Sequence, residues 1–108
     1  MHRIEYYSEA VRREIAELPL TMRARYAGYA ERMKQFGPNL GMPHSRTMGN
    51  GLFELRLKGT EGIARVFYCT MVEGRIVMLH SFIKKTQETP ARELDTAKRR
   101  MKEIKHET

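Results

Sequence analysis

Basic side chains interrupt the apolar segments in the second half of the sequence. Arg65 is the single charge within the run 62–68, and the others alternate with apolar residues or end similar runs. The set comprises Arg56, Lys58, Arg65, His80, Lys84 and Lys85. A cation in a strand pattern often lies on a half-solvated face beside a carboxylate. On neighbouring strands, which lie about 4.8 Å apart, these residues would instead form one patch within reach of a phosphate.

Such a patch could cleave RNA without a metal ion. The reaction needs a base for the 2′-hydroxyl proton, a cation for the phosphorane oxygens and an acid for the departing 5′-oxygen. Arginine suits the second role, because it is planar, bidentate and always charged. A lysine crowded by like charges can act as a base, and histidine can take either proton-transfer role.

Other kinds of site find little support in the sequence. The four histidines (His2, His44, His80 and His106) show no metal-ligand spacing, and Cys69 is the single cysteine. We therefore expect no metal and no cofactor. The glycines of 41–51 match neither a P-loop nor a dinucleotide-binding fingerprint. Cys69 lies within an apolar strand pattern and is expected in the core.

The overall charge favours an anionic partner. Twenty Lys and Arg against 13 Asp and Glu give a net charge of +7 and a pI near 9.9. Such a charge is typical of nucleic-acid-binding domains. Two other interpretations stay open: a basic surface that is only solvated, and binding to an anionic membrane. The 108 residues suit one domain, 1–108. No secretory signal or apolar span is present, and one cysteine suits a reducing compartment. We expect a cytoplasmic protein without a membrane partner.

The first half of the chain predicts a short strand and two helices. Residues 2–7 suit a strand, and Ser8 is an expected N-cap for a helix with apolar residues at Val11, Ile15 and Leu18. A second helix is expected over 20–36, ended by Gly37 and Pro38. Residues 39–51 are rich in glycine and proline and are expected to form a loop.

The second half predicts an antiparallel meander and a final helix. Alternating or β-branched runs at 52–58, 63–71 and 75–83 are joined by short turns. Pro90, preceded by Thr89 as an N-cap, begins a helix with an apolar seam through 94–104. The expected order is β-α-α-β-β-β-α, an α+β fold with an antiparallel sheet, two N-terminal helices and a C-terminal helix.

Several segments together resemble a known toxin family. They are GLFELR at 51–56, GIARVFY at 62–68, HSFIKKTQ at 80–87, Thr-Pro at 89–90 and AKRRM at 97–101. This set resembles the HigB-like, phage-derived branch of the RelE/ParE toxin superfamily. The resemblance implies a RelE-like fold and a type II toxin that acts as a metal-independent, ribosome-dependent mRNA endoribonuclease. It also implies three partners: a helix-turn-helix antitoxin, the ribosome and mRNA.

The resemblance also suggests roles for individual residues. Arg56 and Arg65 look like the family's phosphate-binding, transition-state arginines, and Lys84 and Lys85 like its cations at the end of the last strand. Further candidates are His80 for catalysis, Lys58 and Tyr68 for RNA contact, and Arg99 and Arg100 for docking on ribosomal RNA. Many relatives carry an acid or base after the last strand, where this chain has Thr86, Gln87 and Glu88. The general base and general acid therefore stay unassigned.

Two alternatives remain open from the sequence. A toxin of the same fold could act by binding a protein such as DNA gyrase, which would not need a cluster of cations on the sheet. A non-catalytic nucleic-acid-binding domain would account for the charge of +7 but not for the position of the basic residues.

Overall fold

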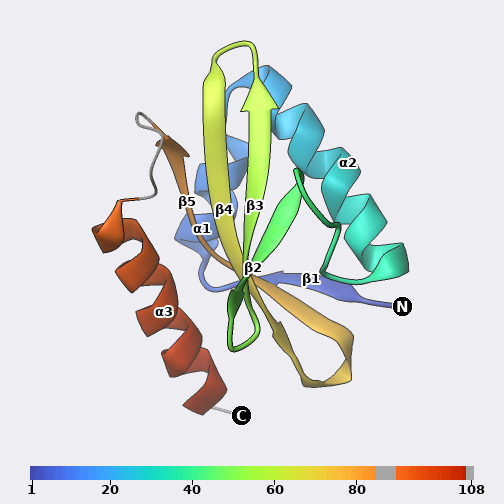
Figure 1. Ribbon diagram of the computed structural model, residues 1–108, viewed down its shortest axis with the longest axis vertical. Helices are drawn as coiled ribbons and strands as arrows, with labels where there is room; N and C mark the ends of the chain where they lie inside the picture. Colours follow the sequence, from blue (N-terminus) through green and yellow to red (C-terminus); the bar gives the residue numbers. More distant parts are fainter. Residues whose placement is uncertain (85–89, 107–108) are drawn as a thin grey trace.

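The fold is a five-stranded sheet with helices on both faces (Figure 1). The computed structural model describes residues 1–84 and 90–106. Its elements, in chain order, are β1 (Arg3–Tyr6), α1 (Glu9–Ala16), α2 (Leu20–Phe36), β2 (Ser45–Gly49), β3 (Leu52–Gly59), β4 (Gly62–Met71), the 3-10 turn η1 (Val72–Gly74), β5 (Arg75–Lys84) and α3 (Ala91–His106). The α+β class, both N-terminal helices, the meander and the C-terminal helix are confirmed.

Two parts of the sheet differ from the expectation. The strand order is β1-β5-β4-β3-β2, and β1 runs parallel to β5, so the sheet is mixed rather than antiparallel. Residues 45–49, expected within a loop, form β2, which pairs antiparallel with β3. β2 is an edge strand whose side chains are mostly exposed. It is held by backbone pairing on one side and therefore lacks the apolar alternation by which strands are recognised.

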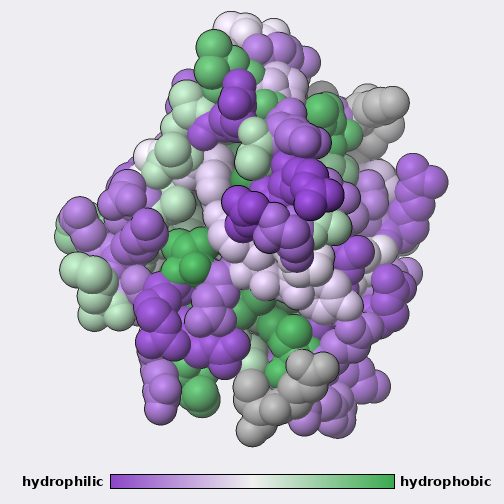
Figure 2. All heavy atoms as spheres, turned by 180° about the vertical axis from the view of Figure 1, so that it is seen from behind, coloured by the Kyte–Doolittle hydropathy of each residue, from purple (hydrophilic) through white to green (hydrophobic). Residues whose placement is uncertain are grey.

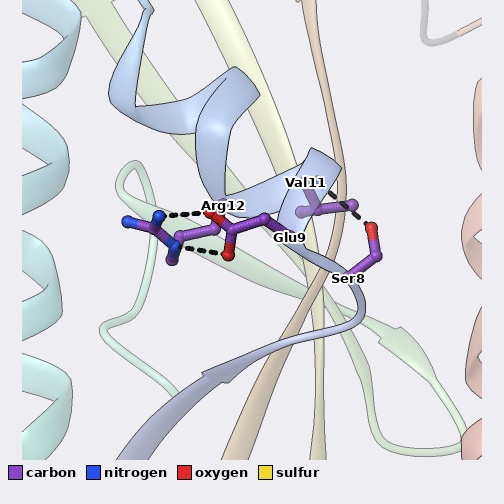
Figure 3. Close-up of polar contacts among 4 residues, drawn as sticks. All are labelled: Ser8, Glu9, Val11 and Arg12. Carbon is purple, nitrogen blue, oxygen red and sulfur yellow. Dashed lines mark hydrogen bonds and ion pairs between the residues drawn. The ribbon is translucent and has the colours of Figure 1, made fainter.

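Helix ends follow the local sequence signals. The Ser8 side chain accepts a hydrogen bond from the backbone N–H of Val11 at 3.2 Å, which confirms the expected N-cap of α1. Arg12 reaches back one turn to the carboxylate of Glu9, with Nε 2.9 Å from Oε2 (Figure 3). Gly37 ends α2 with a φ of +100°, a conformation that glycine adopts without strain.

The two faces of the sheet are covered unequally. Helices α1 and α2 pack on one face, over a core that includes Leu55, Val66 and Tyr68. Helix α3 packs on the other face over Leu52, Phe67 and Leu79 (Figure 1). A single helix covers only part of that second face, and the rest of it carries the polar residues described below. From behind, hydrophilic side chains cover most of the surface and hydrophobic ones show in separate patches (Figure 2). None of the described helices is long and apolar enough to cross a membrane.

A β-bulge in β5 sets which residues share the α3 face. Phe67 pairs with His80, whereas the next residue, Tyr68, pairs with Met78, so Leu79 has no partner across the strand. The extra residue shifts the alternation by one position. As a result His80, Phe82 and Lys84 lie on the same face as Arg65, rather than on the face that α1 and α2 cover.

Candidate active site

Two arginines lie side by side at the centre of the open part of the α3 face. Arg56 on β3 and Arg65 on β4 are direct partners in the antiparallel register, and Phe82 of β5 is the next residue in the same row. Lys84 lies in the adjoining row, opposite Ile63. The sheet thus brings together Arg56, Arg65 and Lys84, three residues that the sequence singled out.

A buried carboxylate that the sequence analysis missed anchors this cluster. The Glu54 side chain is fully buried, and its Oε1 lies 2.8 Å from Arg65 Nη1 and 3.3 Å from Arg46 Nε. Arg46 comes from β2, directly opposite Glu54. Glu54 could have been found from the sequence, because it lies two residues before Arg56 and therefore shares a face of β3 with it. Arg46 could not be found in this way, because its segment shows no strand pattern.

The ion pair occupies Nη1 of Arg65, and burial limits the other donors of the two arginines. The Nε atoms of Arg56 and Arg65 are both buried and make no hydrogen bond among the described residues. The Arg65 side chain is 12% exposed. The donors that remain for a phosphate are therefore those of the terminal Nη groups, which keep the planar fork that matches phosphate oxygens.

Burial and neighbouring charges lower the pKa values of Arg65 and Lys84. Burial lowers the pKa of the Arg65 guanidinium, and the Glu54 carboxylate opposes this effect. The pKa of the Lys84 ammonium is also lowered, first by burial and then by the charge of Arg65. The Glu54 carboxylate opposes this effect, and Arg46 and Arg56 add smaller effects that lower the pKa. Lowering the pKa of a lysine increases its neutral fraction at a given pH, and the neutral amine is the form that accepts a proton.

The arginines open onto two adjoining pockets. The first, of about 110 Å³, is lined by Met42, Pro43, His44, Ser45, Arg46, Glu54, Arg56 and Arg65. The second, of about 190 Å³, shares Pro43, His44 and Arg56 with the first and adds Arg25, Tyr29 and Lys58. Lys58 lines the second pocket together with Arg56, so it lies near the arginine pair, as expected. It does not line the first pocket.

The placement of Tyr68 contradicts its expected role in stacking on RNA. Its side chain is fully buried on the opposite face, where the ring stacks on Phe53 with centroids 5.3 Å apart. The hydroxyl donates to the carbonyl oxygen of Pro38 at 2.5 Å, and burial raises its pKa to about 12. Three positions separate Tyr68 from Arg65, so strand alternation turns the two side chains to opposite faces. Tyr68 is a core residue.

We expect Tyr68→Phe to lower stability without lowering activity. The substitution removes one buried hydrogen bond and leaves the Pro38 carbonyl without that donor, at a cost of about 1 kcal/mol in the free energy of unfolding. Urea denaturation of both proteins measures this difference. A folded Tyr68→Phe protein with less than a third of the wild-type RNA-cleaving activity would mean that the hydroxyl does more than support the core.

Two further candidates hold α3 against the sheet. Nε2 of His80 lies 2.9 Å from Oε1 of Glu93, and His80 does not line either pocket. Arg100 donates from Nη1 to the Leu79 carbonyl at 2.8 Å and lies over the Tyr7 ring, 4.8 Å from its centroid. The Arg100 guanidinium thus uses one donor and one ring face within the protein, and its contact with RNA stays a prediction.

The roles of Arg99 and Lys85 stay predictions. Arg99 is exposed on α3, where it stays a candidate for contact with RNA. Lys85 lies outside the described residues, as do Thr86, Gln87, Glu88 and the expected N-cap Thr89.

We expect Glu54→Gln to weaken the fold and to disorder the arginine pair. The change removes the charge from two charge-assisted contacts at a fully buried position, at a cost of about 1.5–3 kcal/mol in the free energy of unfolding. Glu31→Gln is the matched control, since Glu31 pairs with Lys34 on the exposed surface of α2 and should leave the melting temperature unchanged. Equal melting temperatures for the two variants would contradict an anchoring role for Glu54.

A comparison with known families identifies the family of this chain. The family described as Phage derived protein Gp49-like (DUF891) matches residues 13–102, a span that runs from α1 to the last turns of α3 and includes every residue of both pockets. No curated protein matches the chain. Because the match covers most of its length, the chain belongs to the Gp49-like family of phage-derived, toxin-like proteins.

Proposed function

We propose that this protein is the toxin of a type II toxin–antitoxin pair and that it cleaves mRNA on the ribosome, as the HigB-like branch does. The observation that carries the proposal is the Arg56–Arg65 pair on the α3 face of the sheet, in which the buried Glu54 holds Arg65. Two adjacent guanidinium groups can bind the scissile phosphate and stabilise the charge that develops on its oxygens.

In the proposed reaction the RNA supplies its own nucleophile. The 2′-oxygen attacks the adjacent phosphorus, the bond from phosphorus to the 5′-oxygen breaks, and the products end in a 2′,3′-cyclic phosphate and a 5′-hydroxyl. Lys84 accepts the proton of the 2′-hydroxyl, for which its lowered pKa suits it. Arg56 and Arg65 stabilise the pentacovalent phosphorus, while Lys58 and the exposed Arg99 contribute to RNA binding. No metal or cofactor takes part.

The proposed partners follow from the family and the charge. A toxin-like protein implies an antitoxin, here a helix-turn-helix protein, that blocks the site or the approach of the ribosome. The net charge of +7 favours docking on ribosomal RNA, because each phosphate neutralised by Lys or Arg releases counterions.

Inducible expression with and without the neighbouring gene tests the function. We expect growth arrest that the neighbour relieves, and primer extension on cellular mRNA should show new 5′ ends within codons. Arg13→Ala, which removes an exposed arginine from α1, is the matched control for Arg56→Ala and should remain toxic. Growth arrest without mRNA cleavage would instead support a toxin that binds a protein target.

A further inference from the structure

His44 occupies a position between the two pockets that the proposed reaction leaves without a role. Its backbone carbonyl accepts a hydrogen bond from the N–H of Arg56 at 2.8 Å, so His44 continues the row formed by Arg65 and Arg56. His44 lines both the pocket with Arg65 and the pocket with Lys58. Of the four histidines, it is the one that lines a pocket with the arginine pair, among the residues that the structure describes.

The ring of His44 is held from the α2 side by Tyr29. The Tyr29 hydroxyl lies 3.0 Å from Nδ1 of His44, and the two ring centroids are 5.1 Å apart. Tyr29 is itself 9% exposed, and the Arg32 guanidinium lies 5.8 Å from its ring centroid. A tyrosine fixed in this way restricts the rotation of the imidazole that it contacts.

The hydrogen bond also determines which nitrogen can exchange a proton. A hydroxyl oxygen can accept from Nδ1–H, and that bond persists whether or not Nε2 is protonated. No hydrogen bond among the described residues engages Nε2. Nε2 is therefore the nitrogen that remains for proton transfer, while Nδ1 keeps its partner.

The order of the strands places His44 and Lys84 on opposite sides of the arginines. Lys84 is on β5, beyond Arg65, whereas His44 precedes β2, beyond Arg56. In an in-line displacement at phosphorus, the attacking and leaving oxygens also lie on opposite sides of the phosphorus atom. With Lys84 at the 2′-oxygen, the leaving 5′-oxygen faces His44.

We propose that His44 is the general acid of the reaction and that Tyr29 positions it. This inference rests on the proposed RNA cleavage. As the 2′-oxygen bonds to phosphorus and gives its proton to Lys84, Nε2–H of His44 gives a proton to the departing 5′-oxygen, which leaves as a hydroxyl. One proton is taken and one is given, so the reaction needs no further reactant. The acid that the sequence lacks after its last strand is thus supplied from the segment before β2.

An RNA with sulfur in place of the leaving 5′-oxygen tests this assignment. A thiolate departs without a proton, because a thiol is a much stronger acid than an alcohol, so the general acid becomes unnecessary. We expect His44→Ala to slow cleavage of the all-oxygen RNA on the ribosome by a factor of about 10²–10³. The same variant should cleave the sulfur-containing RNA within about threefold of the wild-type rate. Normal cleavage of the second substrate also shows that the variant is folded.

Two further variants complete the experiment. His106→Ala, at the exposed end of α3, is the matched control and should cleave both RNAs as the wild type does. Tyr29→Phe keeps the ring but loses the hydroxyl, and we expect an intermediate loss that the sulfur substitution also relieves.

The possible outcomes separate this assignment from the proposed function. If His44→Ala cleaves the all-oxygen RNA at the wild-type rate, or is slow on both RNAs, His44 is not the general acid. If the wild-type protein cleaves neither RNA on the ribosome, the proposed function itself is wrong and the assignment falls with it.

Discussion

Arg65→Ala should reduce the rate of mRNA cleavage by a factor of about 10²–10³, because it removes a preorganised donor from the transition state at a cost of about 3–4 kcal/mol. Arg65 is held at 2.8 Å from the buried Glu54, so its guanidinium is already oriented when RNA arrives. Single-turnover cleavage of ribosome-bound mRNA measures the effect. Arg56→Ala should behave similarly, since the two residues are partners across the strands.

The structure adds a condition to this experiment, because Arg65 also stabilises a buried charge. Its removal leaves Glu54 without its closest described partner and should lower the melting temperature. Arg65→Lys is the appropriate companion, since it retains a positive charge for Glu54 but not the forked donors that bind phosphate. We expect Arg65→Lys to recover most of the stability and little of the activity. A folded Arg65→Ala protein with full activity would remove Arg65 from the mechanism.

Replacing the 2′-hydroxyl of the nucleotide on the 5′ side of the cut by hydrogen should abolish cleavage altogether. The proposed reaction takes its nucleophile from the RNA, and the deoxy nucleotide has none at that position. Binding should survive, because in the proposed complex Arg56, Arg65 and Lys58 contact phosphates rather than the missing hydroxyl. Cleavage gels and filter binding on the same substrate measure the two effects separately.

The product termini provide an independent check on the same mechanism. The upstream fragment of an all-ribose RNA should carry a 2′,3′-cyclic phosphate, and the downstream fragment a 5′-hydroxyl. Chelation of added metal should leave the rate unchanged, provided that the magnesium needed for ribosome integrity is restored. If the deoxy RNA is cut as fast as the ribose RNA, the nucleophile is not the 2′-hydroxyl, and the roles of Arg56, Arg65 and Lys84 fail together.

The sequence predicted the elements that bury apolar side chains. Both N-terminal helices, the meander and α3 show the periodicity of a half-buried helix or strand, and the end of α2 at Gly37 follows from glycine and proline. The edge strand β2 was missed because its pairing involves the backbone and leaves its side chains exposed. The expectation of a loop over residues 39–51 gives neither Arg46 nor His44 a place beside the arginines.

The candidate site was predictable where the alternation of side chains along a single strand determines which face of the sheet they lie on. Glu54 and Arg56 share a face by their spacing alone, and the same rule applied to Arg65 would have placed Tyr68 in the core. Lys84 is different, because the bulge at Leu79 reverses the alternation of β5 and leaves no mark in the sequence. The contact between Tyr29 and His44 joins α2 to the segment before β2, and only the tertiary structure brings them together.

The bulge in β5 has a consequence for comparing this chain with its relatives. A gene that lost the codon for Leu79 would place Met78 and His80 on consecutive positions opposite Tyr68 and Phe67, so the ladder would be regular and Lys84 would still lie opposite Ile63. A relative that keeps this residue but pairs without the bulge would instead turn Lys84 to the side of the sheet that faces α1 and α2, and Ile83 would take its place beside the arginines. A gap of one residue at Leu79 in an alignment is therefore compatible with the same cluster of cations, whereas a gap of one residue between His80 and Lys84 would break it.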